Sequence, residues 1–99
     1  MTSESELSIA VLQVLAARPN GEAGFAELRL EVPQHVQLSA ADHEPSTTRP
    51  GEEIWEQRLR NITSHKSSPG NIIHEGYVES IPAGLRLTAA GRLHVNRAA

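Results

Sequence analysis

Polar and basic side chains gather between residues 57 and 66, and one further arginine stands apart at position 86. Arginine and asparagine side chains can each make two hydrogen bonds to the edge of a guanine or an adenine in the major groove of duplex DNA. Lysine and arginine also pair with the phosphates of the DNA backbone. The candidate DNA-contacting residues are therefore Gln57, Arg58, Arg60, Asn61, Ser64, His65, Lys66 and Arg86.

The positions of these residues assign them different contacts. Base edges lie within reach of side chains on neighbouring turns of one helix, here Gln57, Arg60, Asn61 and Ser64. Phosphates suit the flanking basic residues, which are Arg58, Lys66 and, near the end of the run, His65. Arg86 follows Pro82-Ala83-Gly84, a compact turn from which it could reach the minor groove or a phosphate.

A solvated amphipathic helix would carry the same residue types. Glu56 and Arg60 are four positions apart and would pair on a helix surface. Arg86 could equally face solvent. Trp55 shares a helix side with Leu59, which predicts a core position rather than a stacking platform for bases. The residues alone leave DNA contact and the solvated face open.

Catalytic and metal-binding patterns are missing from the sequence. Its five histidines show no His-x-x-x-His or His-Glu-x-x-His spacing, and the chain has no cysteine. His65, Asn71 and His74 match the letters of a His-Asn-His nuclease, but their spacing is too tight for its strand-and-helix finger. No Ser-His-Asp arrangement, carboxylate pair or glycine-rich phosphate loop stands out. We expect no enzyme activity, no catalytic residues, no metal and no cofactor.

The charge of the chain is unevenly distributed. Its net charge is −3, which argues mildly against a dedicated nucleic-acid binder. Residues 1–53 carry nine acidic and three basic residues, a net charge of −6, whereas residues 54–99 carry six basic and three acidic residues, a net charge of +3. Such asymmetry can create a surface that faces a polyanion, and in so short a chain it can also arise by chance.

Targeting and membrane signals are absent from the sequence. The amino terminus is acidic and lacks the basic-then-apolar order of a signal peptide, and no apolar run reaches membrane-spanning length. The lack of cysteine suits a reducing compartment. We expect a cytoplasmic protein with no membrane partner.

Helical patterns occupy three parts of the chain. Ser3-x-x-Glu6 is a capping-box sequence that opens a helix ending at Arg18–Gly21. The stretch Phe25–Val32 fits a helix or a strand, and Pro33 ends it in either case. Glu52–Ser67 is the second strong helix, with an apolar stripe formed by Ile54, Trp55, Leu59 and Ile62.

The rest of the chain predicts a loop, a hairpin and a last helix. Residues 39–51 are rich in helix breakers and form a connector, with a short helical turn at Ser39–Asp42. We favour a loop inside one domain over a linker between two, because neither side has enough apolar residues for its own core. Tyr77–Ile81 and Leu85–Leu87 flank the compact turn, and Thr88 can cap a short helix.

These elements predict an α+β fold, mostly α, formed by residues 1–99 as a single domain with 39–51 as an internal loop. Three helices followed by a two-stranded β-hairpin wing and a short C-terminal helix is the order of a winged helix-turn-helix.

The second half of the chain resembles the N-terminal winged-helix domain of Mrr-type restriction endonucleases and related modules. The residues that carry the resemblance are Trp55-Glu56-Gln57-Arg58-Leu59-Arg60-Asn61, Glu75-Gly76-Tyr77-Val78-Glu79 and Leu87-Thr88-Ala89-Ala90-Gly91-Arg92. The resemblance covers roughly residues 51–93. It implies a winged-helix fold and a role in DNA targeting. It does not carry nuclease activity, because those domains usually precede a nuclease domain and nothing follows residue 99 here. The stretch from Ser64 to Asn71 also departs from the family's short link.

Two functions are compatible with these residues and elements. The first is a duplex-DNA-binding module, alone or as the targeting domain of a restriction-type or regulatory system, with double-stranded DNA and a protein such as a nuclease domain as partners. The alternative is a protein–protein interaction module on the same scaffold without DNA binding. A homodimer is compatible with both. One feature distinguishes the two functions. DNA binding is favoured if the basic side chains at 58, 60, 66 and 86 share one face that is free of acidic side chains.

Overall fold

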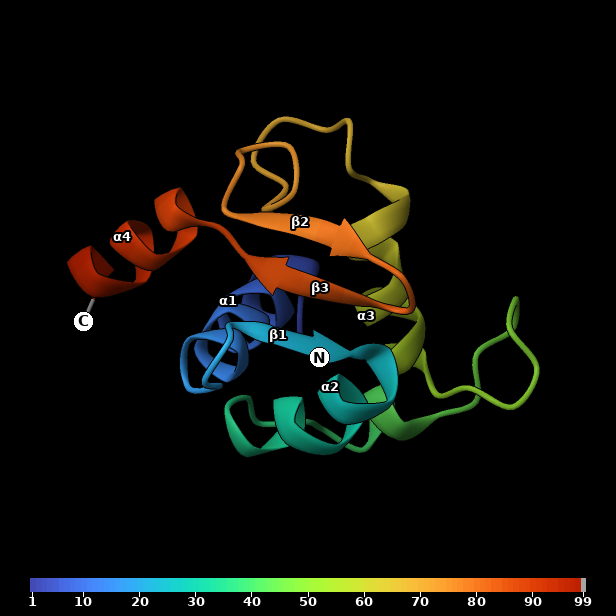
Figure 1. Ribbon diagram of the computed structural model, residues 1–99. Coiled ribbons are helices and arrows are strands. Elements are labelled where there is room, and N and C mark those ends of the chain that lie inside the picture. The colour runs from blue at the N-terminus through green and yellow to red at the C-terminus, as the bar shows by residue number, and fades with distance from the viewer. Residues whose placement is uncertain (99) are drawn as a thin grey trace.

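The computed structural model describes residues 1–98 of the chain (Figure 1). Over this range the chain forms α1 (Glu4–Ala16), β1 (Glu22–Gly24), α2 (Phe25–Glu31), α3 (Ile54–Ser64), β2 (Val78–Ile81), β3 (Gly84–Leu87) and α4 (Ala89–Ala98). Short 3-10 turns lie at Val32–Gln34 and Ala41–His43. The described residues thus form an α+β fold of four α-helices and a small antiparallel sheet, as the sequence predicts at this level.

Helix α1 begins at the predicted capping box. The Glu6 N–H donates to Ser3 Oγ at 3.1 Å, and the Ser3 N–H donates in return to Glu6 Oε1 at 3.0 Å. This reciprocal pair satisfies two of the backbone donors that a helix start leaves open. The buried side of α1 places Leu7, Val11 and Leu15 in the centre of the core.

The sheet has three strands, one more than the predicted hairpin. Its order is β1-β3-β2, and β1 pairs antiparallel with β3, with Ala23 opposite Leu85. Gly84 permits this pairing, because a Cβ atom at Gly84 would lie 2.3 Å from the Ala23 carbonyl oxygen. The predicted hairpin itself is confirmed as β2 and β3, joined through Pro82 and Ala83.

Helix α2 resolves the ambiguity of residues 25–32 in favour of a helix. It follows β1 directly, and the Gly24 N–H donates to Glu27 Oε1 at 3.0 Å. Only Leu28 of this helix is buried, and Leu30 is exposed on the other side. The strand that this stretch could also have formed is therefore absent, and Leu30 faces solvent.

Helix α3 is shorter than predicted and spans Ile54–Ser64 rather than residues 52–67. Its apolar stripe buries Trp55, Leu59 and Ile62, which confirms the core position predicted for Trp55. The Trp55 indole N–H donates to Glu53 Oε1 at 2.9 Å, so its one polar atom has a partner.

Helix α4 starts at the predicted cap and continues to Ala98. The Gly91 N–H donates to Thr88 Oγ1 at 2.9 Å, and the Thr88 hydroxyl donates to the Gly76 carbonyl at 2.5 Å. Gly91 lies against the Tyr77 carbonyl, where a Cβ atom would come within 1.9 Å of its oxygen. Figure 1 shows α4 projecting from one end of the molecule.

The core draws on both sides of the predicted loop. Leu7, Leu28, Leu59 and Leu85 all belong to one buried apolar cluster. The segment after the turn at Ala41–His43 projects from the body of the molecule in Figure 1. An isolated antiparallel β-bridge between Pro45 and Glu53 joins the two ends of this segment. Among the helices of residues 1–98, none combines the length and apolar character needed to cross a membrane.

Candidate nucleic-acid interface

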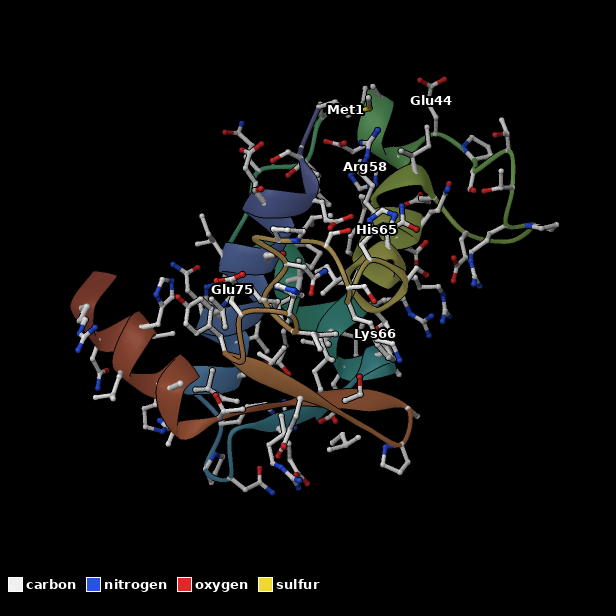
Figure 2. All side chains as sticks on the ribbon, turned by 90° about the horizontal axis from the view of Figure 1, so that it is seen from above. Met1, Glu44, Arg58, His65, Lys66 and Glu75 are labelled. Atoms are coloured by element: carbon white, nitrogen blue, oxygen red, sulfur yellow. The ribbon has the colours of Figure 1, made fainter. Side chains whose placement is uncertain are left out.

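Arg58 is directed toward the start of the chain rather than toward open solvent. Its guanidinium donates to the Thr2 carbonyl oxygen at 3.2 Å and lies 3.7 Å from Asp42 Oδ1. Figure 2 shows Arg58 beneath Met1 and apart from Lys66. A fully buried carboxylate needs hydrogen bonds and a counter-charge. Arg58 therefore supports the position of the first residues.

Asp42 receives more than this one cation. The Thr2 N–H donates to Asp42 Oδ1 at 3.1 Å, and the Ser39 N–H and hydroxyl donate to Oδ2 at 2.8 and 3.0 Å. Burial by itself would raise the pKa of Asp42, but the hydrogen bonds from Ser39 and Thr2 outweigh it and hold the pKa below its usual value.

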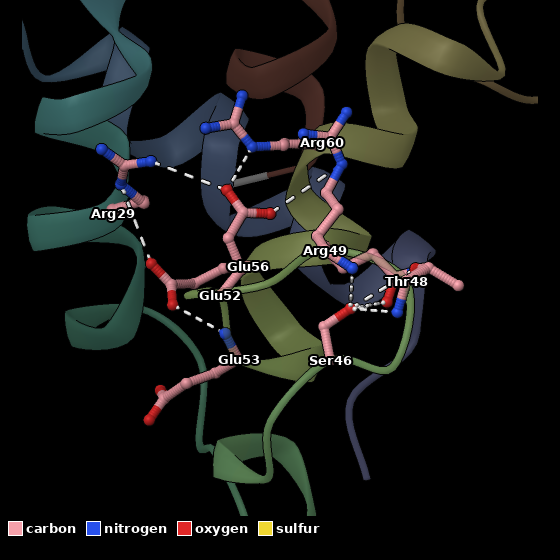
Figure 3. Close-up of polar contacts among 9 residues, drawn as sticks. Arg29, Ser46, Thr48, Arg49, Glu52, Glu53, Glu56 and Arg60 are labelled. Carbon is pink, nitrogen blue, oxygen red and sulfur yellow. Dashed lines mark hydrogen bonds and ion pairs between the residues drawn. The ribbon is translucent and has the colours of Figure 1, made fainter.

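Arg60 lies at the other side of α3 and binds Glu52. Its Nε donates to Glu52 Oε2, and Arg29 Nη1 lies 3.9 Å from the same oxygen. Arg49 Nε lies 4.0 Å from Glu52 Oε1, and Arg29 Nε lies 3.8 Å from Glu56 Oε2. Figure 3 shows these three arginines arranged around the two carboxylates. We call Arg29, Arg49, Arg60, Glu52 and Glu56 the arginine cluster.

The remaining polar residues of α3 differ in exposure. Gln57 Oε1 accepts a hydrogen bond from Ser46 Oγ at 2.7 Å, which ties α3 to the projecting loop. Asn61 is half-buried, whereas Ser64 and Lys66 are exposed. His65 Nδ1 lies 2.7 Å from Glu4 Oε1 at the start of α1. Lys66 lies two positions beyond the end of α3.

Arg86 lies on the central strand between two carboxylates. Its Nε donates to Glu79 Oε1 at 2.8 Å, and its Nη1 donates to Glu22 Oε2 at 3.3 Å. The hydrogen bond to Glu79 raises the pKa of Arg86 above its usual value, with Glu22 adding to the effect. The positive charge of Arg86 is therefore largely balanced on the molecule itself.

The structure gathers some of the predicted residues and separates others. Arg60 belongs to the arginine cluster, and Gln57 bonds to the loop that carries Arg49. Arg58 faces Asp42, and Arg86 lies on the sheet. Arg58, Arg60 and Arg86 do not share one face free of acidic residues, because they pair with Asp42, Glu52 and Glu22 of the first half of the chain. Arg29 and Arg49 were missed because they come from α2 and the loop, and no spacing in the sequence connects them to Arg60.

A shallow groove of about 510 Å³ lies on another side of the molecule. It runs between α1, the segment 65–77 and α4, and Ile9 and Leu12 contribute apolar surface to it. Tyr77 and His94 stack at its edge with ring centroids 4.1 Å apart. Over residues 1–98, no three histidine, aspartate or glutamate side chains come together in a way that could hold a metal ion.

Comparisons of this chain with protein-family models, curated proteins and solved structures gave no match. The resemblance to the Mrr-type domain therefore remains a prediction from the residues that carry it.

Proposed function

We propose that this chain is a winged-helix module that binds duplex DNA, with α3 in the major groove and the β2–β3 hairpin as the wing. The observation that carries the proposal is the arrangement of the elements. Three helices precede a hairpin whose strand β3 is fixed in the middle of the sheet by β1. In helix-turn-helix proteins the groove-entering helix presents polar and basic side chains on its exposed side.

The surface that we assign to DNA differs in part from the sequence-based set. It comprises Arg29, Arg49 and Arg60 of the arginine cluster, with Lys66 beyond the end of α3. The three arginine side chains are 35%, 52% and 34% exposed, so each has donors available to phosphate. Arg58 is omitted from this surface because it binds Thr2 and Asp42.

Fluorescence anisotropy with a labelled random duplex, titrated at several salt concentrations, tests the proposal. We expect affinity that falls steeply with salt, because neutralised phosphates release counterions. Arg49→Ala and Lys66→Ala should each reduce the salt slope by about 1, the change expected for one lost phosphate contact. Arg97→Ala, an exposed charge change on α4, is the matched control and should leave the slope unchanged.

Two results would contradict the proposal. One is equal affinity and equal salt slope for Arg49→Ala, Lys66→Ala and the parent chain. The other is flat anisotropy for every duplex tried, even at low salt.

A protein-interaction module is the second candidate function, and the pairing of the basic residues supports it. Arg58, Arg60 and Arg86 each contact a carboxylate of the same molecule, which weakens their attraction for phosphate. The groove beside α1 offers Ile9, 59% exposed, as an apolar contact. Flat anisotropy, with the chain shown to be folded by circular dichroism, would favour this function over DNA binding.

A further inference from the structure

The arginine cluster has the composition of an anion site whose anion is a side chain of the protein. Three guanidinium groups from α2, the loop and α3 surround the Glu52 carboxylate. Only the Arg60 Nε contact is a hydrogen bond, since the Arg29 and Arg49 contacts to Glu52 are 3.9 and 4.0 Å long. Most donors of the three arginines are therefore not used by Glu52.

The exposed fractions of these side chains also indicate that the arginines have donors left for another anion. The Glu52 side chain is only 13% exposed, whereas the arginines around it are one-third to one-half exposed. Glu52 Oε1 is buried and has no hydrogen-bond partner among the described residues. A buried charged oxygen without a hydrogen bond is unfavourable, so Glu52 is an imperfect anion for this site.

Phosphodiester oxygens suit such a site better than one carboxylate. Planar guanidinium groups bind phosphate through paired hydrogen bonds, and a phosphate has more acceptor positions than Glu52 can present to three arginines. With Glu56 also present, the arginine cluster has three positive and two negative charges, a net charge of +1. A single phosphodiester would neutralise it.

We propose that Arg29, Arg49 and Arg60 form a phosphodiester-binding site that Glu52 occupies in the free protein. A DNA phosphate can then bind only if the Glu52 carboxylate moves away from the arginines. Glu52 therefore lowers the affinity for DNA, and only DNA that makes enough other contacts with the protein binds. This inference rests on the proposed DNA-binding function for its biological meaning. The phosphate chemistry of the site can be tested without DNA.

The first test compares Glu52→Gln with Glu44→Gln. Both remove one negative charge from the same loop, but Glu44 is exposed and takes no part in the ion pairs of the arginine cluster. Removing a carboxylate from a phosphate contact should tighten duplex binding at low salt by about tenfold, because like charges placed together are costly. Glu44→Gln should change it by less than about threefold, since exposed charges are screened.

The second test uses inorganic phosphate in place of DNA. Addition of millimolar phosphate should raise the unfolding temperature of Glu52→Gln more than that of the parent chain or of Glu44→Gln, because a ligand that binds only the folded state stabilises it. The same titration with Arg60→Ala added to Glu52→Gln should lose this gain. Thermal unfolding without phosphate shows whether each variant is folded. If Glu52→Gln is not folded, Glu52→Ala is tested in its place.

The outcomes separate the inference from the proposed function. If the parent chain binds duplex DNA but Glu52→Gln and Glu44→Gln behave alike in both tests, the occupied site is wrong and DNA binding stands. If neither the parent chain nor Glu52→Gln binds DNA but phosphate selectively stabilises Glu52→Gln, the anion site stands and the DNA proposal fails. A gain that persists in the absence of Arg60 would also overturn the site.

Discussion

Asp42 is the residue on which the start of the chain depends. Its carboxylate has no exposed surface and accepts hydrogen bonds from Thr2 and Ser39, with Arg58 alongside. These contacts connect three segments that are far apart in sequence, since Thr2 and Asp42 are 40 positions apart. Such a buried charge is favourable only while all its partners remain in place.

The lowered pKa of Asp42 predicts a loss of stability in acid. A group whose pKa is lower in the folded than in the unfolded state contributes stability above its unfolded pKa, about 4, and loses it as the pH falls through the folded value. Asp42→Asn should therefore lower the free energy of unfolding near pH 7 by about 2 kcal/mol and flatten its decline below about pH 5. Urea unfolding across this pH range measures both effects.

Glu44→Gln is the control for that experiment, because Glu44 is an exposed carboxylate two positions from Asp42. It should keep the pH dependence of the parent chain. An acid profile of Asp42→Asn that matches the parent profile would show that Asp42 is not the group responsible.

At the scale of elements, two close backbone approaches set the positions of β1 and α4. At Gly84 the central strand approaches Ala23, and at Gly91 the first turn of α4 approaches Tyr77. In both places the neighbour is a backbone carbonyl, which cannot move aside as the end of a side chain could. The requirement for glycine here is one of space, since neither residue has a positive φ.

Gly91→Ala provides a test in which helix propensity and packing have opposite effects. Alanine favours a helix by about 1 kcal/mol over glycine. A Cβ atom 1.9 Å from the Tyr77 oxygen would instead force α4 away from the sheet, at a cost of about 1–3 kcal/mol for an overpacked site. We expect a net loss of stability in thermal unfolding. Asn96→Ala, exposed on the same helix, should leave stability unchanged or slightly higher. A rise for Gly91→Ala would refute the close packing.

On the scale of the whole molecule, one apolar cluster and several ion pairs join the two halves of the chain. Leu7 and Leu28 pack in the same cluster as Ile62 and Leu85, and the acidic and basic halves meet in pairs such as Glu52–Arg60. The core is therefore formed by residues from both sides of the loop at 44–53, and the loop itself contributes no residue to it.

This shared core predicts a single unfolding transition. Trp55, buried on α3, reports on the second half, whereas far-UV circular dichroism also reports α1 and α2. Both signals should give the same urea midpoint, as expected for a small two-state protein. Ile62→Ala should lower both midpoints together, with a loss of about 2–5 kcal/mol. Two separate midpoints, or a shift of the Trp55 signal alone, would show that the halves unfold independently.

Features that depend on near neighbours were predictable from the amino-acid order alone. The Ser3 cap of α1, the Thr88 cap of α4 and the hairpin at 78–87 were all predicted, because each is formed by residues within a few positions of one another. The apolar stripe of α3, with Trp55 in the core, was predicted from helical spacing for the same reason.

The other features depend on contacts that only the folded chain makes. Strand β1 has three residues and no alternating pattern, and it exists because β3 offers it a partner 62 positions away at Ala23 and Leu85. The contacts of the candidate site residues also depend on the folded chain. Arg58 and Arg60 are two positions apart on one helix, yet they face Asp42 and Glu52 on opposite sides. Charge interactions act through space at a few ångströms, so the partner of each arginine is decided by the folded chain and not by its neighbours in sequence.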